Sequence, residues 1–215
     1  MTIRAVGFDI DHTLAVDNRL EFTVAVEMIG ADRRADVESA LSSYRTGKQT
    51  MDEAMSAIGV DPQRFRRRVL ERAASHIRCV AGAKDVLRTI RERGIPAAIL
   101  SNGWSPLQEI KAQVIGFAGP VLVSDVIGAS KPSRSAFTAL RDALDVPADA
   151  IAYVGDDPAA DVAGAIAAGM TGVWFDWEGR TYPQDGPPAS LTIHALVDVL
   201  RVLPGPLFDV ANRPL

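Results

Sequence analysis

Cysteine, histidine and lysine are scarce in this chain of 215 residues. Cys79 is the only cysteine and there are three histidines, so an internal disulfide and a thiolate metal cluster are excluded. The chain has 23 basic residues, of which four are lysines, against 27 acidic ones. The resulting net charge of −4 lacks the basic excess expected of a protein that binds nucleic acid.

Long apolar runs are also missing. No stretch approaches the roughly 18 consecutive apolar residues that a bilayer-spanning helix needs, so no membrane partner is expected. Residues 1–4 lack the basic start of a secretory signal peptide, and the cytoplasm is the expected location. Hydrophobic residues nevertheless make up 47% of the chain, which is enough for a folded core and excludes global disorder.

The spacing of apolar residues predicts an α/β protein interrupted by a helical insertion. A short apolar strand over residues 3–9 is followed by residues 17–79, in which we expect helices and no strand. Beyond this segment, short apolar runs alternate with helices, which is typical of a parallel sheet with helical crossovers. The later strands are expected at residues 96–100, 120–124, 151–154 and 171–175, the last being the final strand. The predicted domains are therefore a Rossmann-like core of residues 1–16 and 80–215 and a helical cap of residues 17–79.

Several residues predict where helices begin and end. Pro62 suits the first turn of a helix, Ser133 suits an N-cap, and Gly94 suits the position just after a last turn. The tail from Pro204 onward is rich in proline and has little periodicity, so we expect it either to pack along the surface or to be loose.

Polar residues follow the predicted strands at the edge where open α/β sheets carry their reactive groups. The first strand runs into D-I-D-H-T at residues 9–13. Its two carboxylates, Asp9 and Asp11, crowd each other unless a cation or a proton offsets their charge. The alternative is a pair of aspartates that only form a turn or a cap.

The second and third polar segments offer donors to an anion. Ser101-Asn102-Gly103 presents a hydroxyl, an amide and a glycine N–H, which suit a phosphoryl oxygen, although S-N-G is also common in turns. Lys131, in S-K-P, precedes the helix that Ser133 caps. A lone lysine is usually a solvated surface charge.

The fourth segment, G-D-D-P-A-A-D at residues 155–161, carries three acids within six residues. Mg²⁺ prefers oxygen ligands, so this density of carboxylates after a strand predicts a site for a hard cation. Capping of the following helix is the competing explanation, and we expect it to account for at least one of the three acids.

Together and in this order, the four segments resemble the motifs of the haloacid dehalogenase superfamily, in its phosphatase-like branch. The matching motifs are D-I-D-H-T, the serine of S-N-G, the lysine of S-K-P, and G-D-x-x-x-x-D. The resemblance covers roughly residues 3–176 and implies a haloacid dehalogenase-like fold. The helical segment is similar to the small α-helical cap of many members.

The resemblance also implies catalytic and metal-binding roles. Asp9 would be the nucleophile that forms an aspartyl-phosphate, and Asp11 would be the general acid and base. Lys131 would act on the transferring phosphoryl group. Mg²⁺ would be held by Asp9, Asp156 and Asp11, the last through its backbone carbonyl.

Further residues are implied to bind phosphate or to support the metal site. The phosphate-binding residues would be Ser101, Asn102 and Lys131. The additional residues would be Thr13, Asp157 and Asp161. For Thr13, fixing the turn after the strand is an equal alternative.

These roles are chemically consistent with one another. A carboxylate and a phosphate dianion repel, so Asp9 can attack only where a cation bridges both. Asp11 must be protonated to give the leaving alkoxide a proton, and ionised to activate water afterwards. The dehalogenases of the superfamily lack this second aspartate because halide leaves without a proton. Its presence favours phosphoryl transfer over cleavage of a carbon–halogen bond.

The sequence therefore predicts a Mg²⁺-dependent phosphatase that acts on a small phosphorylated metabolite. One alternative is a phosphomutase of the same superfamily, similar to β-phosphoglucomutase, which uses the same two aspartates. A non-catalytic binding relative would have lost at least one of Asp9, Asp11, Lys131 and Asp156, all of which are present. No nucleic-acid or membrane partner is expected, and the oligomeric state is left open.

Overall fold

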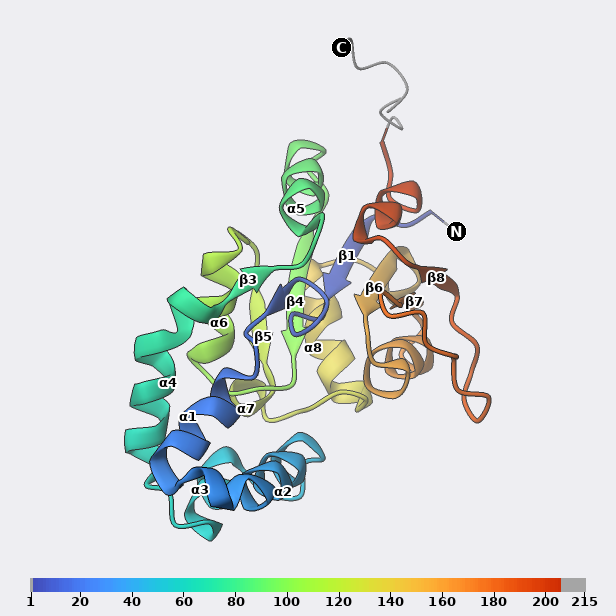
Figure 1. Cartoon of the computed structure of the whole chain (residues 1–215). Coiled ribbons are helices and arrows are strands. Elements are labelled where there is room, and N and C mark those ends of the chain that lie inside the picture. The colour runs from blue at the N-terminus through green and yellow to red at the C-terminus, as the bar shows by residue number, and fades with distance from the viewer. Residues whose placement is uncertain (1, 206–215) are drawn as a thin grey trace.

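A parallel β-sheet of six strands lies at the centre of the part of the chain that the structure describes (Figure 1). This structure is a computed structural model and describes residues 2–205. The strands are β1 (Ala5–Phe8), β4 (Ala97–Ser101), β5 (Val121–Val123), β6 (Ile151–Gly155), β7 (Thr171–Phe175) and β8 (Leu191–Ile193). Their order is β5-β4-β1-β6-β7-β8, and all neighbours run parallel. The predicted α/β core is confirmed.

Helices pack on both faces of this sheet. They are α5 (Ala83–Glu92), α6 (Leu107–Val114), α8 (Arg134–Leu144), α9 (Gly164–Ala167) and the 3₁₀ helix η4 (Leu196–Arg201). Along β1, Val6 and Phe8 join the hydrophobic cluster that includes α5, α6 and η4, whereas Ala5 joins the cluster that includes α8 and α9. Successive side chains of a strand point to opposite faces, so one strand serves both clusters.

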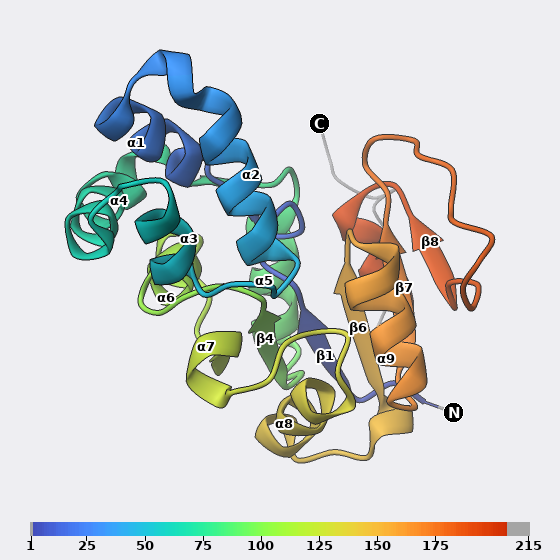
Figure 2. The same ribbon diagram turned by 90° about the horizontal axis from the view of Figure 1, so that it is seen from below.

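A helical segment lies between two short strands, β2 (Ala15–Val16) and β3 (Arg78–Cys79). It contains α1 (Leu20–Ile29), the 3₁₀ helix η1 (Ala31–Arg33), α2 (Arg34–Arg45), α3 (Met51–Ala57) and α4 (Pro62–His76). Figures 1 and 2 show these helices grouped to one side of the sheet, away from β7 and β8. β2 and β3 pair antiparallel, which holds the entry and the exit of the segment side by side. The exact division into core and cap stays a prediction.

The helix signals read from the sequence are confirmed. Pro62 lies in the first turn of α4, and the Ser133 hydroxyl accepts the backbone N–H of Ala136 at 3.4 Å, at the start of α8. Gly94 follows the end of α5 with a φ of 66°, in the left-handed region that glycine enters without steric cost.

Other predictions of secondary structure were wrong. β3 lies inside residues 17–79, where no strand was expected, and β8 follows residues 171–175, which were expected to form the final strand. Ser124 begins the short helix α7 (Ser124–Ile127) instead of ending a strand. Strands of two or three residues and a single helical turn are too short to show the periodicity on which sequence prediction depends.

Two remaining short helices flank β6. They are the 3₁₀ helix η2 (Ala148–Ala150) and the π-helical turn η3 (Pro158–Ala163), which continues into α9 where one helix was predicted. Among the described residues, no helix combines the length and the apolar character needed to cross a membrane. The expectation for the tail falls largely on residues 206–215, which lie outside the described residues.

Candidate active site

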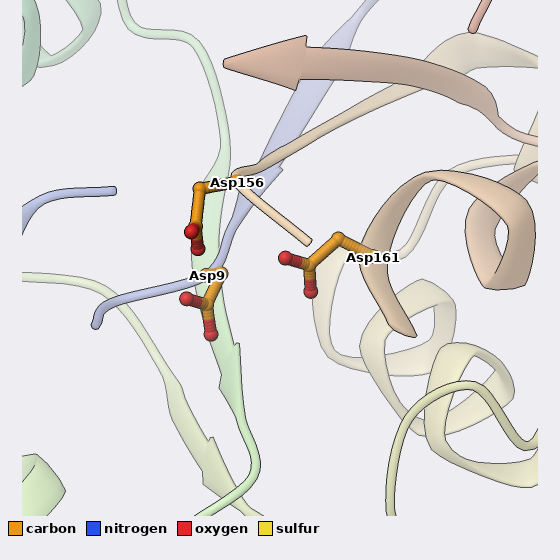
Figure 3. A group of neighbouring side chains, drawn as sticks. All are labelled: Asp9, Asp156 and Asp161. Carbon is orange, nitrogen blue, oxygen red and sulfur yellow. The ribbon is translucent and has the colours of Figure 1, made fainter. Parts of the chain in front are cut away.

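Three carboxylates converge at the carboxyl end of the sheet (Figure 3). Asp9 follows β1, Asp156 follows the neighbouring strand β6, and Asp161 lies in η3. One oxygen of each carboxylate lies within 4.8 Å of the other two. Asp9 and Asp161 are 6% and 1% exposed, so the cluster is largely buried. The structure thus brings together residues that are up to 152 positions apart (161 − 9).

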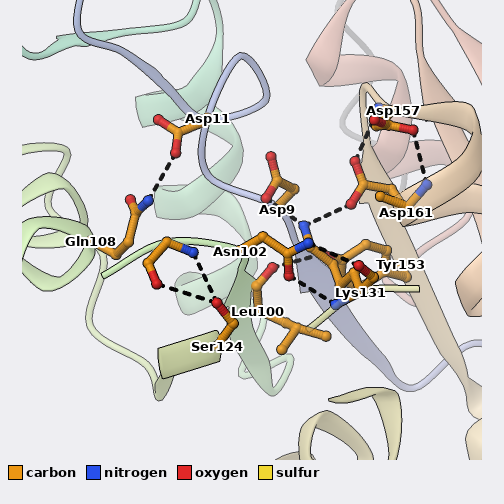
Figure 4. A network of polar contacts seen from close by, with 12 residues as sticks. Asp9, Asp11, Leu100, Asn102, Gln108, Ser124, Lys131, Tyr153, Asp157 and Asp161 are labelled. Atoms are coloured by element: carbon orange, nitrogen blue, oxygen red, sulfur yellow. Dashed lines mark hydrogen bonds and ion pairs between the residues drawn. The ribbon is translucent and has the colours of Figure 1, made fainter. Parts of the chain in front are cut away.

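Lys131 neutralises part of this charge. Its Nζ lies 2.6 Å from Asp9 Oδ1 and 2.7 Å from Asp161 Oδ1, and its side chain is 3% exposed (Figure 4). Lys131 lies in the loop that leads into α8, as predicted, and α7 intervenes between β5 and this loop. Lys131 is therefore a buried counter-ion and not a solvated surface charge.

The pKa values of the cluster reflect burial and crowding. Burial raises the pKa of Asp9; the Lys131 ammonium opposes this rise, and the Asp161 and Asp11 carboxylates add to it. Burial, reinforced by Asp161, raises the pKa of Asp156 to about 6. The Arg180 guanidinium lies 3.7 Å from Asp156 Oδ2 and partly opposes this rise. The oxygen donors and the surplus of negative charge fit a hard divalent cation such as Mg²⁺.

Asp157, the second of the three acids in the fourth motif, caps a helix. Asp157 Oδ1 accepts the backbone N–H groups of Ala159 and Ala160 at 2.8 and 2.9 Å, which confirms that at least one acid of this motif is an N-cap. The Asp157 N–H donates to Asp161 Oδ2 at 3.0 Å and so steadies that carboxylate. A Cβ on Gly155 would lie 2.2 Å from the same oxygen, so only glycine leaves room for Asp161.

Two predicted site residues carry buried hydroxyls with no hydrogen-bond partner among the described residues. They are Ser101 Oγ, at the end of β4 beside β1, and Thr13 Oγ1. Buried polar groups in proteins are almost always paired. An unpaired hydroxyl at the end of β4 therefore suits a ligand that accepts hydrogen bonds.

The rest of the S-N-G motif has structural partners. Asn102 Nδ2 donates to the Lys131 carbonyl at 2.9 Å, and its Oδ1 accepts the Lys131 N–H at 2.8 Å, so the amide braces the backbone of the lysine. The expectation that the Gly103 N–H faces an anion was wrong, because this N–H donates to Ser124 Oγ at 3.1 Å. A phosphate contact by Asn102 stays a prediction.

Asp11 has partners different from those of Asp9. Its Oδ2 accepts Gln108 Nε2 at 2.9 Å and its Oδ1 lies 2.5 Å from Lys111 Nζ, both on α6 (Figure 4 shows the contact with Gln108). Burial would raise the pKa of Asp11, but the Lys111 ammonium and the Gln108 amide together lower it below its ordinary value. The charge repulsion expected between Asp9 and Asp11 is offset because each carboxylate pairs with a different lysine, Lys131 for Asp9 and Lys111 for Asp11.

Lys111 and Gln108 are site residues that none of the sequence motifs indicated. Lys111 is spaced four residues from both Leu107 and Ile115, so it shares their helix face, and all three are buried. A lysine on the apolar face of a helix, in a chain with only four lysines, is the signal that was available.

A protein-family model described as haloacid dehalogenase-like hydrolase matches residues 3–169. The chain belongs to this family. The phosphoserine phosphatase of Thermus thermophilus is 34% identical over 143 residues, which cover 64% of this chain and 56% of that relative. The ribulose-1,5-bisphosphate 5-phosphatase of Halopiger xanaduensis is 37% identical over 100 residues, 45% of this chain and 42% of the relative. The matched part of the chain thus spans about half the length of these relatives.

Solved structures show the same fold. A haloacid dehalogenase family (HAD) phosphatase from Thermococcus onnurineus superposes with a TM-score of 0.77 at 22% identity, covering 93% of this chain and 97% of that one. At this identity the likeness concerns the fold alone.

Proposed function

We propose that this haloacid dehalogenase-like hydrolase is a Mg²⁺-dependent phosphatase that hydrolyses a small phosphorylated metabolite through an aspartyl-phosphate on Asp9. The observation that carries the proposal is the buried Asp9 carboxylate, 2.6 Å from Lys131 and beside two further carboxylates, at the end of the central strand. Two of the relatives are named as phosphatases, which supports the same reaction class.

Asp9, Asp156 and the backbone carbonyl of Asp11 would hold Mg²⁺, with Asp161 and Asp157 as support. When bound, the cation would offset the repulsion between the Asp9 carboxylate and the phosphate dianion. The residues present fit this role, because the buried carboxylates outnumber the lysine beside them and burial raises the pKa of Asp9 and Asp156. A divalent cation, in addition to the Lys131 ammonium, would keep Asp9 and Asp156 ionised.

In the first half-reaction, an Asp9 oxygen forms a bond to phosphorus while the bond from phosphorus to the substrate oxygen breaks. The leaving oxygen takes a proton from Asp11. In the free protein Lys111 and Gln108 lower the pKa of Asp11, so the negative charge of the bound phosphate would have to raise it again for Asp11 to carry this proton. Lys131 and the unpaired Ser101 hydroxyl would hold the phosphoryl oxygens, whose negative charge they offset or solvate. Thr13 and Asn102 would shape the surrounding loops.

In the second half-reaction, water attacks phosphorus and gives a proton to the Asp11 carboxylate. The bond between phosphorus and Asp9 breaks, inorganic phosphate leaves, and both aspartates return to their starting states. The carboxylate of Asp11 is thus a proton donor in one step and a proton acceptor in the next. Cleavage of a carbon–halogen bond would need no such donor, so Asp11 favours the phosphatase.

The test is release of inorganic phosphate from a panel of phosphorylated metabolites and from p-nitrophenyl phosphate, with Mg²⁺ and with EDTA. Release is expected only with Mg²⁺, and Asp9→Asn should reduce it to background. The matched control is Asp149→Asn, which changes an exposed carboxylate at the opposite end of β6 and should keep full activity.

Undiminished release by Asp9→Asn would refute the nucleophile, and equal release in EDTA would refute the metal. Analysis of the sugar phosphates in the same reactions covers the phosphomutase. Conversion of one isomer into another without free phosphate would replace the phosphatase by that alternative.

A further inference from the structure

A second buried lysine lies on the other side of the D-I-D motif from Lys131. Lys111 is 2% exposed, and its Nζ lies 2.5 Å from Asp11 Oδ1 and 2.9 Å from Asp17 Oδ2. Asp17 directly follows β2, where the chain leaves the core for α1, and its side chain is 15% exposed. One ammonium group therefore joins the second aspartate of the motif to the entrance of the helical insertion.

Gln108 adds a second contact from the same helix. It lies three residues before Lys111, on the same face of α6, and its Nε2 donates to Asp11 Oδ2 at 2.9 Å. Gln108 is 3% exposed, and a Cβ on Gly103 would lie 2.1 Å from its Nε2. Lys111 and Gln108, both on α6, thus each contact one oxygen of Asp11. Gly103, the glycine of S-N-G, has no side chain to occupy the space of Gln108.

This arrangement holds the carboxylate without blocking it. A carboxylate has about four lone-pair sites on its two oxygens, and Lys111 and Gln108 occupy one each. The Asp11 side chain keeps 33% of its surface exposed. A substrate oxygen or a water molecule can therefore reach Asp11 while both contacts to α6 persist.

We propose that Lys111 is a positioning residue for Asp11, and that Asp17 in turn holds Lys111 in place. This inference rests on the proposed function, in which Asp11 carries the proton to and from the substrate. Proton transfer requires the carboxylate to lie within hydrogen-bond reach of the leaving oxygen. Lys111 orients Asp11 through their ion pair, whereas Asp9 is paired with Lys131.

The test compares Lys111→Met with the wild type on two substrates: p-nitrophenyl phosphate, whose leaving group needs little protonation, and the alkyl phosphate that the wild type hydrolyses fastest. The kcat/KM for the alkyl phosphate, which reports the steps up to departure of the leaving group, should fall by about ten-fold or more, because a poorly placed acid loses most of its benefit. The kcat/KM for p-nitrophenyl phosphate should change by less than about three-fold. The ratio of the two kcat/KM values is the readout, because kcat for either substrate also includes hydrolysis of the aspartyl-phosphate, in which Asp11 acts as the base. The matched control is Lys84→Met, at an exposed lysine of α5.

Two further measurements separate positioning from general destabilisation. Lys111→Met should have almost no additional effect on kcat/KM in a chain that already carries Asp11→Asn, since it acts through Asp11. Asp17→Asn leaves Lys111 paired with Asp11, so this variant should fold. It should lower the kcat/KM for the alkyl phosphate selectively, but by less than Lys111→Met.

Equal losses of kcat/KM on both substrates, unchanged kcat/KM values in the Lys111 variant, or a full additional loss in the Asp11→Asn background would overturn the inference. An Asp17→Asn enzyme with an unchanged ratio of the two kcat/KM values would overturn the part assigned to Asp17. Failure of the wild type to release phosphate from any substrate would instead count against the proposed function.

Discussion

Replacing Asp156 by asparagine should stabilise the protein in the absence of metal and remove its response to Mg²⁺. The carboxylate lies in a crowded acidic cluster, and burial with the repulsion of Asp161 raises its pKa from 3.8 to about 6. A rise of about two pKa units corresponds to ~3 kcal/mol of free energy that disfavours the ionised form in the folded state. The side chain is only 20% exposed, so solvent screens this effect little.

The asparagine amide is neutral and avoids this cost. It also loses the attraction of Arg180, which lies 3.7 Å from the carboxylate, so the net gain is smaller than the full figure. We expect Asp156→Asn to raise the free energy of unfolding by ~1–3 kcal/mol near neutral pH in EDTA. For a chain of this size, such a gain raises Tm by roughly 3–8 °C.

The sign of the pH dependence follows from the direction of the pKa change. A carboxyl group with a raised pKa binds protons more tightly in the folded state than in the unfolded state. The stability of the metal-free wild type should therefore increase as the pH falls through about 6 and level off near the ordinary pKa of aspartate, at about 4. Over the same interval, the advantage of Asp156→Asn should disappear.

Thermal unfolding with EDTA and with Mg²⁺, at several pH values, measures both effects. Mg²⁺ should raise the Tm of the wild type, because a ligand that binds only the folded state stabilises it, and should leave that of Asp156→Asn unchanged. Asp149→Asn, the exposed control, should change stability by less than about 0.5 kcal/mol and keep the response to Mg²⁺. A lower Tm for Asp156→Asn in EDTA, or an intact response to Mg²⁺, would refute the electrostatic reasoning.

Three further predictions address the neighbouring residues. Lys131→Met leaves Asp9 and Asp161 buried without their counter-ion and should lower the free energy of unfolding by ~3–5 kcal/mol in urea titrations; a loss below 1 kcal/mol would contradict the buried ion pairs. Gly155→Ala places a Cβ where it displaces Asp161, and should lower stability by ~1–3 kcal/mol together with phosphate release; wild-type activity would show that the site tolerates the displacement. Asp11→Asn should lower kcat/KM for an alkyl phosphate at least ~10-fold more than for p-nitrophenyl phosphate, and equal losses of kcat/KM would exclude Asp11 as the acid.

Much of the fold and the location of the site could be predicted from sequence because the signals are local. The alternation of short apolar runs with helices indicated the parallel sheet, and the polar motifs after the first and fourth predicted strands pointed to the edge where Asp9 and Asp156 meet. Capping by Ser133 and by one acid of residues 155–161, which the structure identifies as Asp157, was likewise readable, since a cap and its helix are adjacent in the chain. Short elements such as β8 escaped because three residues show no period.

The partners of each polar side chain were decided by tertiary structure. Sequence alone determined that this protein has an α/β core, an acidic motif pair and a candidate lysine, because periodicity and motif order are properties of neighbouring residues. Asp9 and Lys131 are 122 positions apart, and Asp11 and Lys111 are 100 apart. Only the placement of α6 and of the loop before α8 beside the D-I-D motif selected which lysine contacts which aspartate, because those contacts exist only once the helices are placed on the sheet.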